Sequence, residues 1–163
     1  MSKFDWNDFI EMSQYIEQKD YMSDISEGKL VEAYQRTMVV QLYYAVFNIS
    51  VETGKKFSDI MESEDNKFIH DPKTVHGAIR SYFSKLSGLF CSYKEIFGSF
   101  NRIPELLSSL HELRKDCHYN GDVKDIYTVC EDAIDIALEV KECLGKINIF
   151  FDKKVQLYKN NGK

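Results

Sequence analysis

The sequence predicts an all-α protein, built as an up-and-down bundle of four to five helices. Apolar residues recur at steps of three and four along most of the chain, which is the spacing of one face of a helix. No stretch alternates between apolar and polar residues as a half-buried strand does, and no hairpin signal occurs. Because the expected links between successive helices are short, neighbouring helices should run antiparallel.

Length and composition are those of an ordinary folded domain. The chain has 163 residues, of which 44% are hydrophobic and 13% aromatic, with only two prolines, so it can bury a core without disulfides or metal. We expect one domain over residues 1–163, with a basic tail that frays over 150–163. No apolar run is long enough for a signal peptide or a membrane span, which favours a cytoplasmic protein without membrane contact.

Charge and cysteine usage exclude several classes of function. A net charge of −5 argues against binding duplex nucleic acid through bulk electrostatics, although contact with a single strand stays open. The four cysteines contain no Cys-x-x-Cys pair, so neither a zinc site nor dithiol chemistry is expected. We therefore expect no metal and no cofactor, and reduced thiols at Cys91, Cys117, Cys130 and Cys143.

Two helices are predicted in the first third of the chain. A short amphipathic helix should cover 5–17, and a long core helix should run from about Leu30 to Val51. The long helix is expected to stop at Thr53-Gly54, because glycine can take the left-handed conformation at a helix C-terminus. The charged segment 58–71 that follows reads as a loop. The apolar stripe expected on the long helix comprises Leu30, Ala33, Thr37, Val40, Tyr44, Phe47 and Val51.

Three more helices are predicted after this loop. The third should span Lys73 to about Phe90. The fourth should start at Pro104, because proline is favoured at the first helical position, and end at Asn120-Gly121. The fifth should run from Val123 to at least Ile149 and fold back along the fourth.

The fourth helix ends in a polar stretch, HELRKDCHYNG, residues 111–121. Arg114 and His118 are four residues apart and therefore share one helix face. A guanidinium can hold a phosphate through its planar fork, and an imidazole can transfer a proton near neutral pH. This pair suits RNA cleavage by attack of the ribose 2′-OH, although such a spacing also occurs on a merely solvated helix face.

Three segments together resemble the HEPN family (higher eukaryotes and prokaryotes nucleotide-binding). The segment AYQRTMVVQLYYAVFNISVETG, residues 33–54, is similar to the long HEPN helix, with Arg36 followed by Tyr43, Tyr44, Ala45 and Phe47. KTVHGAIRSYFSK is similar to its third-helix region, and LHELRKDCHYNGDV to its signature helix. The resemblance covers roughly residues 25–148.

This resemblance implies a homodimeric, metal-independent endoribonuclease of a toxin–antitoxin or antiviral defence system. Arg114 and His118 would be catalytic and would meet their symmetry mates across the dimer. Tyr119 and Asn120 would help to orient the RNA, and Lys115 would add local positive charge. Another reading stays open, because active HEPN nucleases usually place four to six residues between the two side chains and this chain has three. The alternative is a non-catalytic HEPN module that binds a nucleotide, RNA or a partner protein such as a nucleotidyltransferase.

Overall fold

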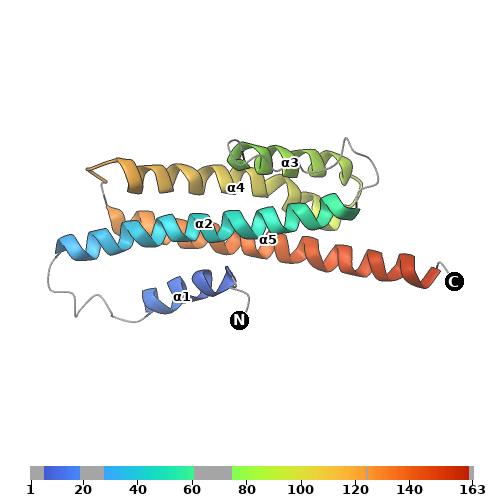
Figure 1. Ribbon diagram of the computed structural model, residues 1–163, viewed down its shortest axis with the longest axis horizontal. Helices are drawn as coiled ribbons and strands as arrows, with labels where there is room; N and C mark the ends of the chain where they lie inside the picture. The colour runs from blue at the N-terminus through green and yellow to red at the C-terminus, as the bar shows by residue number, and fades with distance from the viewer. Residues whose placement is uncertain (1–5, 19–27, 61–74, 124, 162–163) are drawn as a thin grey trace. The chain divides into compact units, whose positions relative to one another are not determined.

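The computed structural model describes residues 6–18, 28–60, 75–123 and 125–161 of the chain, and all regular secondary structure in these ranges is α-helical (Figure 1). The five helices described are α1 (Asn7–Gln18), α2 (Gly28–Ile60), α3 (Val75–Leu89), α4 (Lys94–Tyr119) and α5 (Ile126–Asn161). The predicted all-α class is thus confirmed. No helix in these ranges is both long and apolar enough to cross a membrane.

The helices contribute to two compact units. Unit 1 comprises Met1–Ile49 and Leu106–Glu139, and unit 2 comprises Ser50–Glu105 and Val140–Lys163. In unit 1, α4 runs opposite to both α2 and α5 (Figure 1). For α4 and α5 this direction is expected, because a short turn joins them. The turn at Asn120–Asp122 therefore reverses the chain where the sequence predicted it.

The core of unit 1 corrects the stripe predicted for the long helix. Ala33 and Thr37 were expected inside, but both are exposed. The apolar side chains of α2 that are buried in this unit are Val39, Leu42, Tyr43, Ala45, Val46 and Phe47. Because apolar residues cover much of the circumference of α2, their spacing alone could not fix the side that packs inward.

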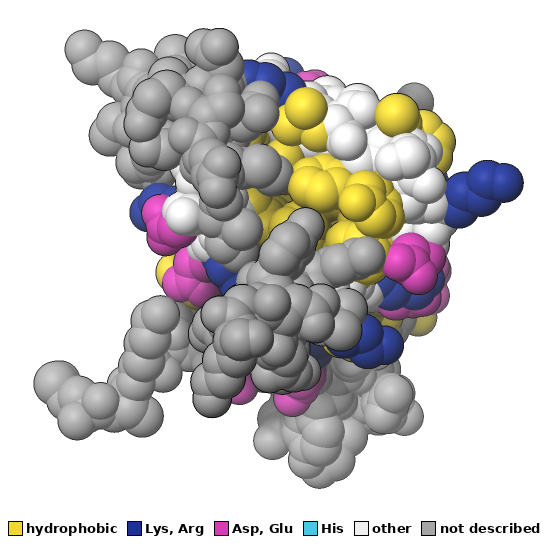
Figure 2. All heavy atoms as spheres, turned by 90° about the vertical axis from the view of Figure 1, so that its right-hand side faces the viewer, with side chains coloured by type: hydrophobic (Ala, Val, Ile, Leu, Met, Phe, Trp, Pro, Cys, Tyr) yellow, Lys and Arg dark blue, Asp and Glu magenta, His cyan; other side chains and the backbone are white. Residues whose placement is uncertain are grey.

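The core of unit 2 is rich in aromatic rings. Phe100 is fully buried, and its ring centroid lies 5.5 Å from that of Phe90, 6.1 Å from that of Phe57 and 6.3 Å from that of Phe83. Such ring clusters supply a large buried apolar area. Hydrophobic side chains also gather on the face shown in Figure 2. Large hydrophobic side chains of unit 2 that are exposed include Leu89, Tyr93, Phe97 and Ile149.

Helix α2 does not stop at Thr53-Gly54 as predicted but continues to Ile60. Gly54 is buried and lies against α3, so that a Cβ at this position would come within 2.9 Å of Ile79 Cδ1. The glycine therefore permits close helix packing instead of ending the helix. Ser58 to Ile60 belong to α2, and the rest of the predicted charged loop lies outside the described residues.

A pair of Gly→Ala substitutions tests this role of Gly54. Gly98 lies in α4 with open space around it, so Gly98→Ala should raise the free energy of unfolding by about 0.5–1 kcal/mol through better helix propensity. Gly54→Ala should forfeit that gain and lower the free energy of unfolding by about 1 kcal/mol, because the new methyl crowds buried Ile79. Urea unfolding of both variants measures the difference, and equal stabilisation by the two would contradict the packing role.

Helix α4 begins at Lys94, so the predicted start at Pro104 is wrong. Pro104 lies inside the helix, where it cannot donate a hydrogen bond to the carbonyl four residues earlier. Its neighbours Ile103 and Phe100 are fully buried, and this apolar packing compensates for the lost bond. The preference of proline for a helix start was overridden by tertiary contacts.

Helix α5 begins at Ile126 and extends to Asn161, so the backbone of the tail predicted to fray is helical up to that residue. The start of the helix is capped by Asp125, which accepts hydrogen bonds from the backbone nitrogen of Thr128 at 3.3 Å and from its hydroxyl at 2.7 Å. These bonds lower the pKa of the Asp125 carboxyl. They are the contacts typical of an N-cap residue.

Candidate functional site

The last two turns of α4 carry the two residues predicted to be catalytic. His118 lies on the exposed surface, whereas Arg114, one turn earlier, is partly buried. Tyr119 is 69% exposed, and its ring meets that of His118 edge to face at a centroid distance of 4.7 Å. Three of the predicted site residues thus lie together at one end of α4, in unit 1.

The guanidinium of Arg114 is held between two tyrosines. Its Nη2 donates a hydrogen bond to the hydroxyl of Tyr44 on α2 at 2.9 Å. Its central carbon lies 5.6 Å from the ring centroid of Tyr44 and 5.5 Å from that of Tyr119. Partial burial lowers the pKa of Arg114, but its interactions with the hydroxyls of Tyr119 and Tyr44 outweigh this and leave the pKa raised. The group is therefore a permanent cation.

The other two predicted site residues, Lys115 and Asn120, bind to acidic side chains of α4. Lys115 Nζ forms an ion pair with Glu112 at 2.8 Å, and Asn120 Nδ2 donates a hydrogen bond to the Asp116 carboxylate at 3.0 Å. Both side chains are exposed, so a ligand can reach them. The positive charge of Lys115, however, is largely offset by its partner, which leaves Arg114 as the stronger anion-binding group.

Arg36 of α2 caps the C-terminal end of α4. Its Nη1 donates hydrogen bonds to the carbonyls of Cys117 at 3.1 Å and Asn120 at 2.5 Å, and its Nη2 to that of Gly121 at 3.3 Å. The last carbonyls of a helix lack donors within the helix and carry partial negative charge. Arg36 therefore fixes the turn that bears His118.

This capping role could not be deduced from the position of Arg36 in the sequence, because the carbonyls it binds lie more than eighty residues later. No glycine among the described residues has a positive φ, so α4 ends at Tyr119 without the left-handed glycine that commonly closes a helix. The side chain of Arg36 satisfies these carbonyls instead.

Neighbouring groups of the polar stretch have structural roles. His111 stacks on buried Tyr43 at a centroid distance of 5.2 Å and an interplanar angle of 22°. Burial raises the pKa of the Cys117 thiol, against a smaller lowering effect of Arg36. Cys117 is buried, and since the thiolate is the reactive form of cysteine, the raised pKa favours a packing role. Of the two adjacent tyrosines, Tyr43 therefore packs on His111 and Tyr44 binds Arg114.

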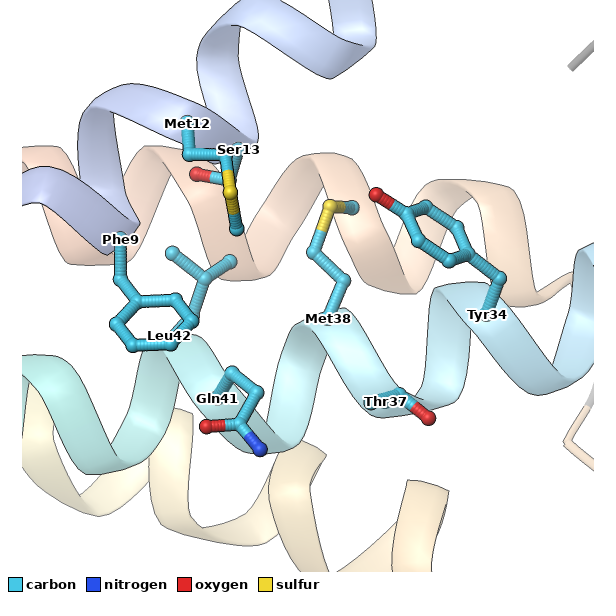
Figure 3. A pocket seen from close by; sticks show the side chains of 8 residues that line it. All are labelled: Phe9, Met12, Ser13, Tyr34, Thr37, Met38, Gln41 and Leu42. Carbon is cyan, nitrogen blue, oxygen red and sulfur yellow. The ribbon is translucent and has the colours of Figure 1, made fainter. Parts of the chain in front are cut away.

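A separate apolar pocket lies between α1 and α2 (Figure 3). Its volume is about 260 Å³. The residues that line it are Phe9, Met12, Ser13, Tyr34, Thr37, Met38, Gln41 and Leu42. None of these is a predicted site residue, and none is among the residues that bind Arg114 or cap the end of α4. The pocket is therefore distinct from the site at the end of α4.

Comparison of the chain with protein-family models, curated proteins and solved structures found no match. Within the described part of the chain, no three His, Cys, Asp or Glu side chains lie close enough to hold a metal ion. The candidate site therefore consists of the residues at the end of α4 and the α2 side chains that contact them.

Proposed function

We propose that this chain is a HEPN-type, metal-independent endoribonuclease that acts as a homodimer in a toxin–antitoxin or phage-defence system. The observation that carries the proposal is the pair of side chains one turn apart on α4: exposed His118, and Arg114 with its guanidinium oriented by Tyr44. A proton-transferring imidazole beside a fixed cation is the chemistry that phosphodiester cleavage requires.

In this mechanism the ribose 2′-oxygen attacks the adjacent phosphorus as His118 removes its proton. Arg114 stabilises the negative charge that develops on the phosphorane oxygens. The bond from phosphorus to the 5′-oxygen then breaks, and the leaving oxygen takes up a proton. In a homodimer His118 of one copy would remove the first proton and His118 of the other would supply the second. The products are a 2′,3′-cyclic phosphate and a 5′-hydroxyl, without oxidation or reduction.

A dimer also reconciles RNA binding with the acidic composition. The net charge of the chain is −5, so long-range attraction for RNA is weak. Two copies of Arg114 converging on one cleft would create a local positive potential, to which Lys115 contributes once a phosphate competes with Glu112. Exposed Tyr119 offers a ring face on which an unpaired base can stack. The substrate is accordingly single-stranded RNA.

The alternative is a HEPN module that binds a nucleotide, RNA or a partner protein, such as a nucleotidyltransferase, without cleaving RNA. It is favoured by the three-residue interval between Arg114 and His118 and by the hydrogen bond that already occupies one donor of Arg114. An arginine that already donates one hydrogen bond within the fold can bind an anionic ligand without taking part in a reaction.

The deciding experiment incubates the purified full chain with single-stranded RNA in excess EDTA. We expect cleavage that persists in the chelator and leaves 2′,3′-cyclic phosphate ends. An Arg114→Ala/His118→Ala double variant, purified in the same way, controls for contaminating nucleases and should be inactive. Intact RNA that shifts in a gel with the wild type would favour the binding module, and equal cleavage by both proteins would refute the nuclease.

A further inference from the structure

Tyr44 occupies an unusual place for an aromatic residue of a core helix. Its neighbours Tyr43, Ala45 and Val46 are buried, whereas Tyr44 is only partly buried and directs its hydroxyl to Arg114 Nη2 at 2.9 Å. We propose that Tyr44 is a positioning residue that orients the Arg114 guanidinium for contact with phosphate. This inference rests on the proposed function and assigns to it a residue from a second helix.

The contacts of Arg114 restrain its guanidinium in three ways. The Tyr44 hydroxyl binds one end of the fork, and the rings of Tyr44 and Tyr119 lie 5.6 Å and 5.5 Å from its central carbon. The Nε atom is buried and has no hydrogen-bond partner among the described residues. A long side chain with several rotatable bonds is thereby confined to a narrow range of orientations. Such preorganisation lowers the entropy cost of binding a phosphate in the reactive geometry.

The chemistry of the partner matters as much as the geometry. A phenol hydroxyl is a neutral acceptor, so the bond to Tyr44 orients Arg114 without neutralising it. By contrast, Arg36 pairs with the carboxylate of Glu32 at 2.7 Å, and Lys115 pairs with that of Glu112 at 2.8 Å. A guanidinium has five N–H donors, and the bond to Tyr44 uses one of them. Since the Nε–H is also buried, Arg114 keeps its charge and its remaining Nη donors for an anionic ligand.

The positions of the contacts along α2 and α4 support this role. Arg36 binds the carbonyls of Cys117 and Asn120, on either side of His118. Tyr44, about two turns further along α2, binds Arg114, about one turn before His118. Because the two helices run in opposite directions in unit 1 (Figure 1), one face of α2 supports both reactive residues. Arg36 acts on the backbone of the turn, and Tyr44 acts on the side chain of Arg114.

The test compares Tyr44→Phe with Tyr34→Phe, which removes a hydroxyl from the same helix at the apolar pocket. We expect Tyr44→Phe to lower kcat/KM for RNA cleavage about tenfold, as one hydrogen bond to a charged group is worth, while Tyr34→Phe leaves it unchanged. In an Arg114→Lys background Tyr44→Phe should lower kcat/KM little further, because Tyr44 acts on the rate through the guanidinium that this background lacks. Additive losses would overturn the proposal, since they would indicate a general effect on the fold.

A second measurement does not depend on activity. Buried Nε–H protons exchange slowly with water, so the Arg114 Nε–Hε signal should be visible by NMR. We expect faster exchange of this proton in Tyr44→Phe and no change in Tyr34→Phe. If the wild type does not cleave RNA, the proposed nuclease function fails, and this exchange still reports whether Tyr44 orients Arg114. Unchanged exchange in Tyr44→Phe would overturn the positioning role even if RNA is cleaved.

Discussion

His118→Ala is expected to lower the rate of RNA cleavage by about 10²- to 10⁴-fold, the usual contribution of a general acid–base residue. The side chain is exposed, so its removal should change the free energy of unfolding by less than about 0.5 kcal/mol. Loss of activity without loss of stability identifies a chemical role. Single-turnover cleavage assays and thermal unfolding of the same preparations provide the two measurements.

His76→Ala is the matched control for this prediction. His76 lies on α3 in unit 2 and is partly exposed, so the substitution removes the same side chain from a place outside the site. We expect its cleavage rate to equal that of the wild type. An equal fall in rate in both variants would point to a general effect of losing histidine, and retained activity in His118→Ala would remove this residue from the mechanism.

The sequence predicted the class of fold because helical periodicity is a local property. The fifth helix illustrates this: its buried residues Cys130, Ala133, Ala137 and Val140 recur at steps of three and four. The errors arose where a distant segment decides the outcome. Gly54 looked like a helix end because the approach of Ile79 cannot be seen in the local sequence.

The candidate site was predictable in part for the same reason. Arg114 and His118 share a face of one helix, so their spacing alone placed them together. The supports from α2 were not predictable, because the hydrogen bond from Arg114 to Tyr44 spans seventy residues of sequence. Tyr44 was expected to belong to the apolar stripe, and only the structure reveals its hydroxyl contact. The pairing of Lys115 with Glu112 was not predictable either, because neighbouring charges on an exposed helix can form several different ion pairs.

Arg36→Ala is expected to lower the free energy of unfolding by about 2–4 kcal/mol. The substitution removes hydrogen bonds to the carbonyls of Cys117, Asn120 and Gly121, each worth about 0.5–1.5 kcal/mol. It also removes a cation from the negative end of the α4 dipole, worth up to about 2 kcal/mol in a partly buried setting. The side chain is only 18% exposed, so water can replace these contacts only in part. Chemical denaturation gives the magnitude.

Arg102→Ala provides the comparison that separates a capping arginine from an ordinary surface arginine. Its ion pair with Glu105 joins side chains that are 45% and 68% exposed, and such pairs contribute about 0–1 kcal/mol.

Because Arg36 fixes the turn after His118, its loss should also speed hydrogen exchange of the last α4 amides and lower the cleavage rate at temperatures where the protein is fully folded. Arg36→Lys should restore the stability only partly, since an ammonium keeps the charge but lacks the planar fork that spans several carbonyls. Equal stability losses for Arg36→Ala and Arg102→Ala would show that capping by Arg36 does not hold the end of α4 in place.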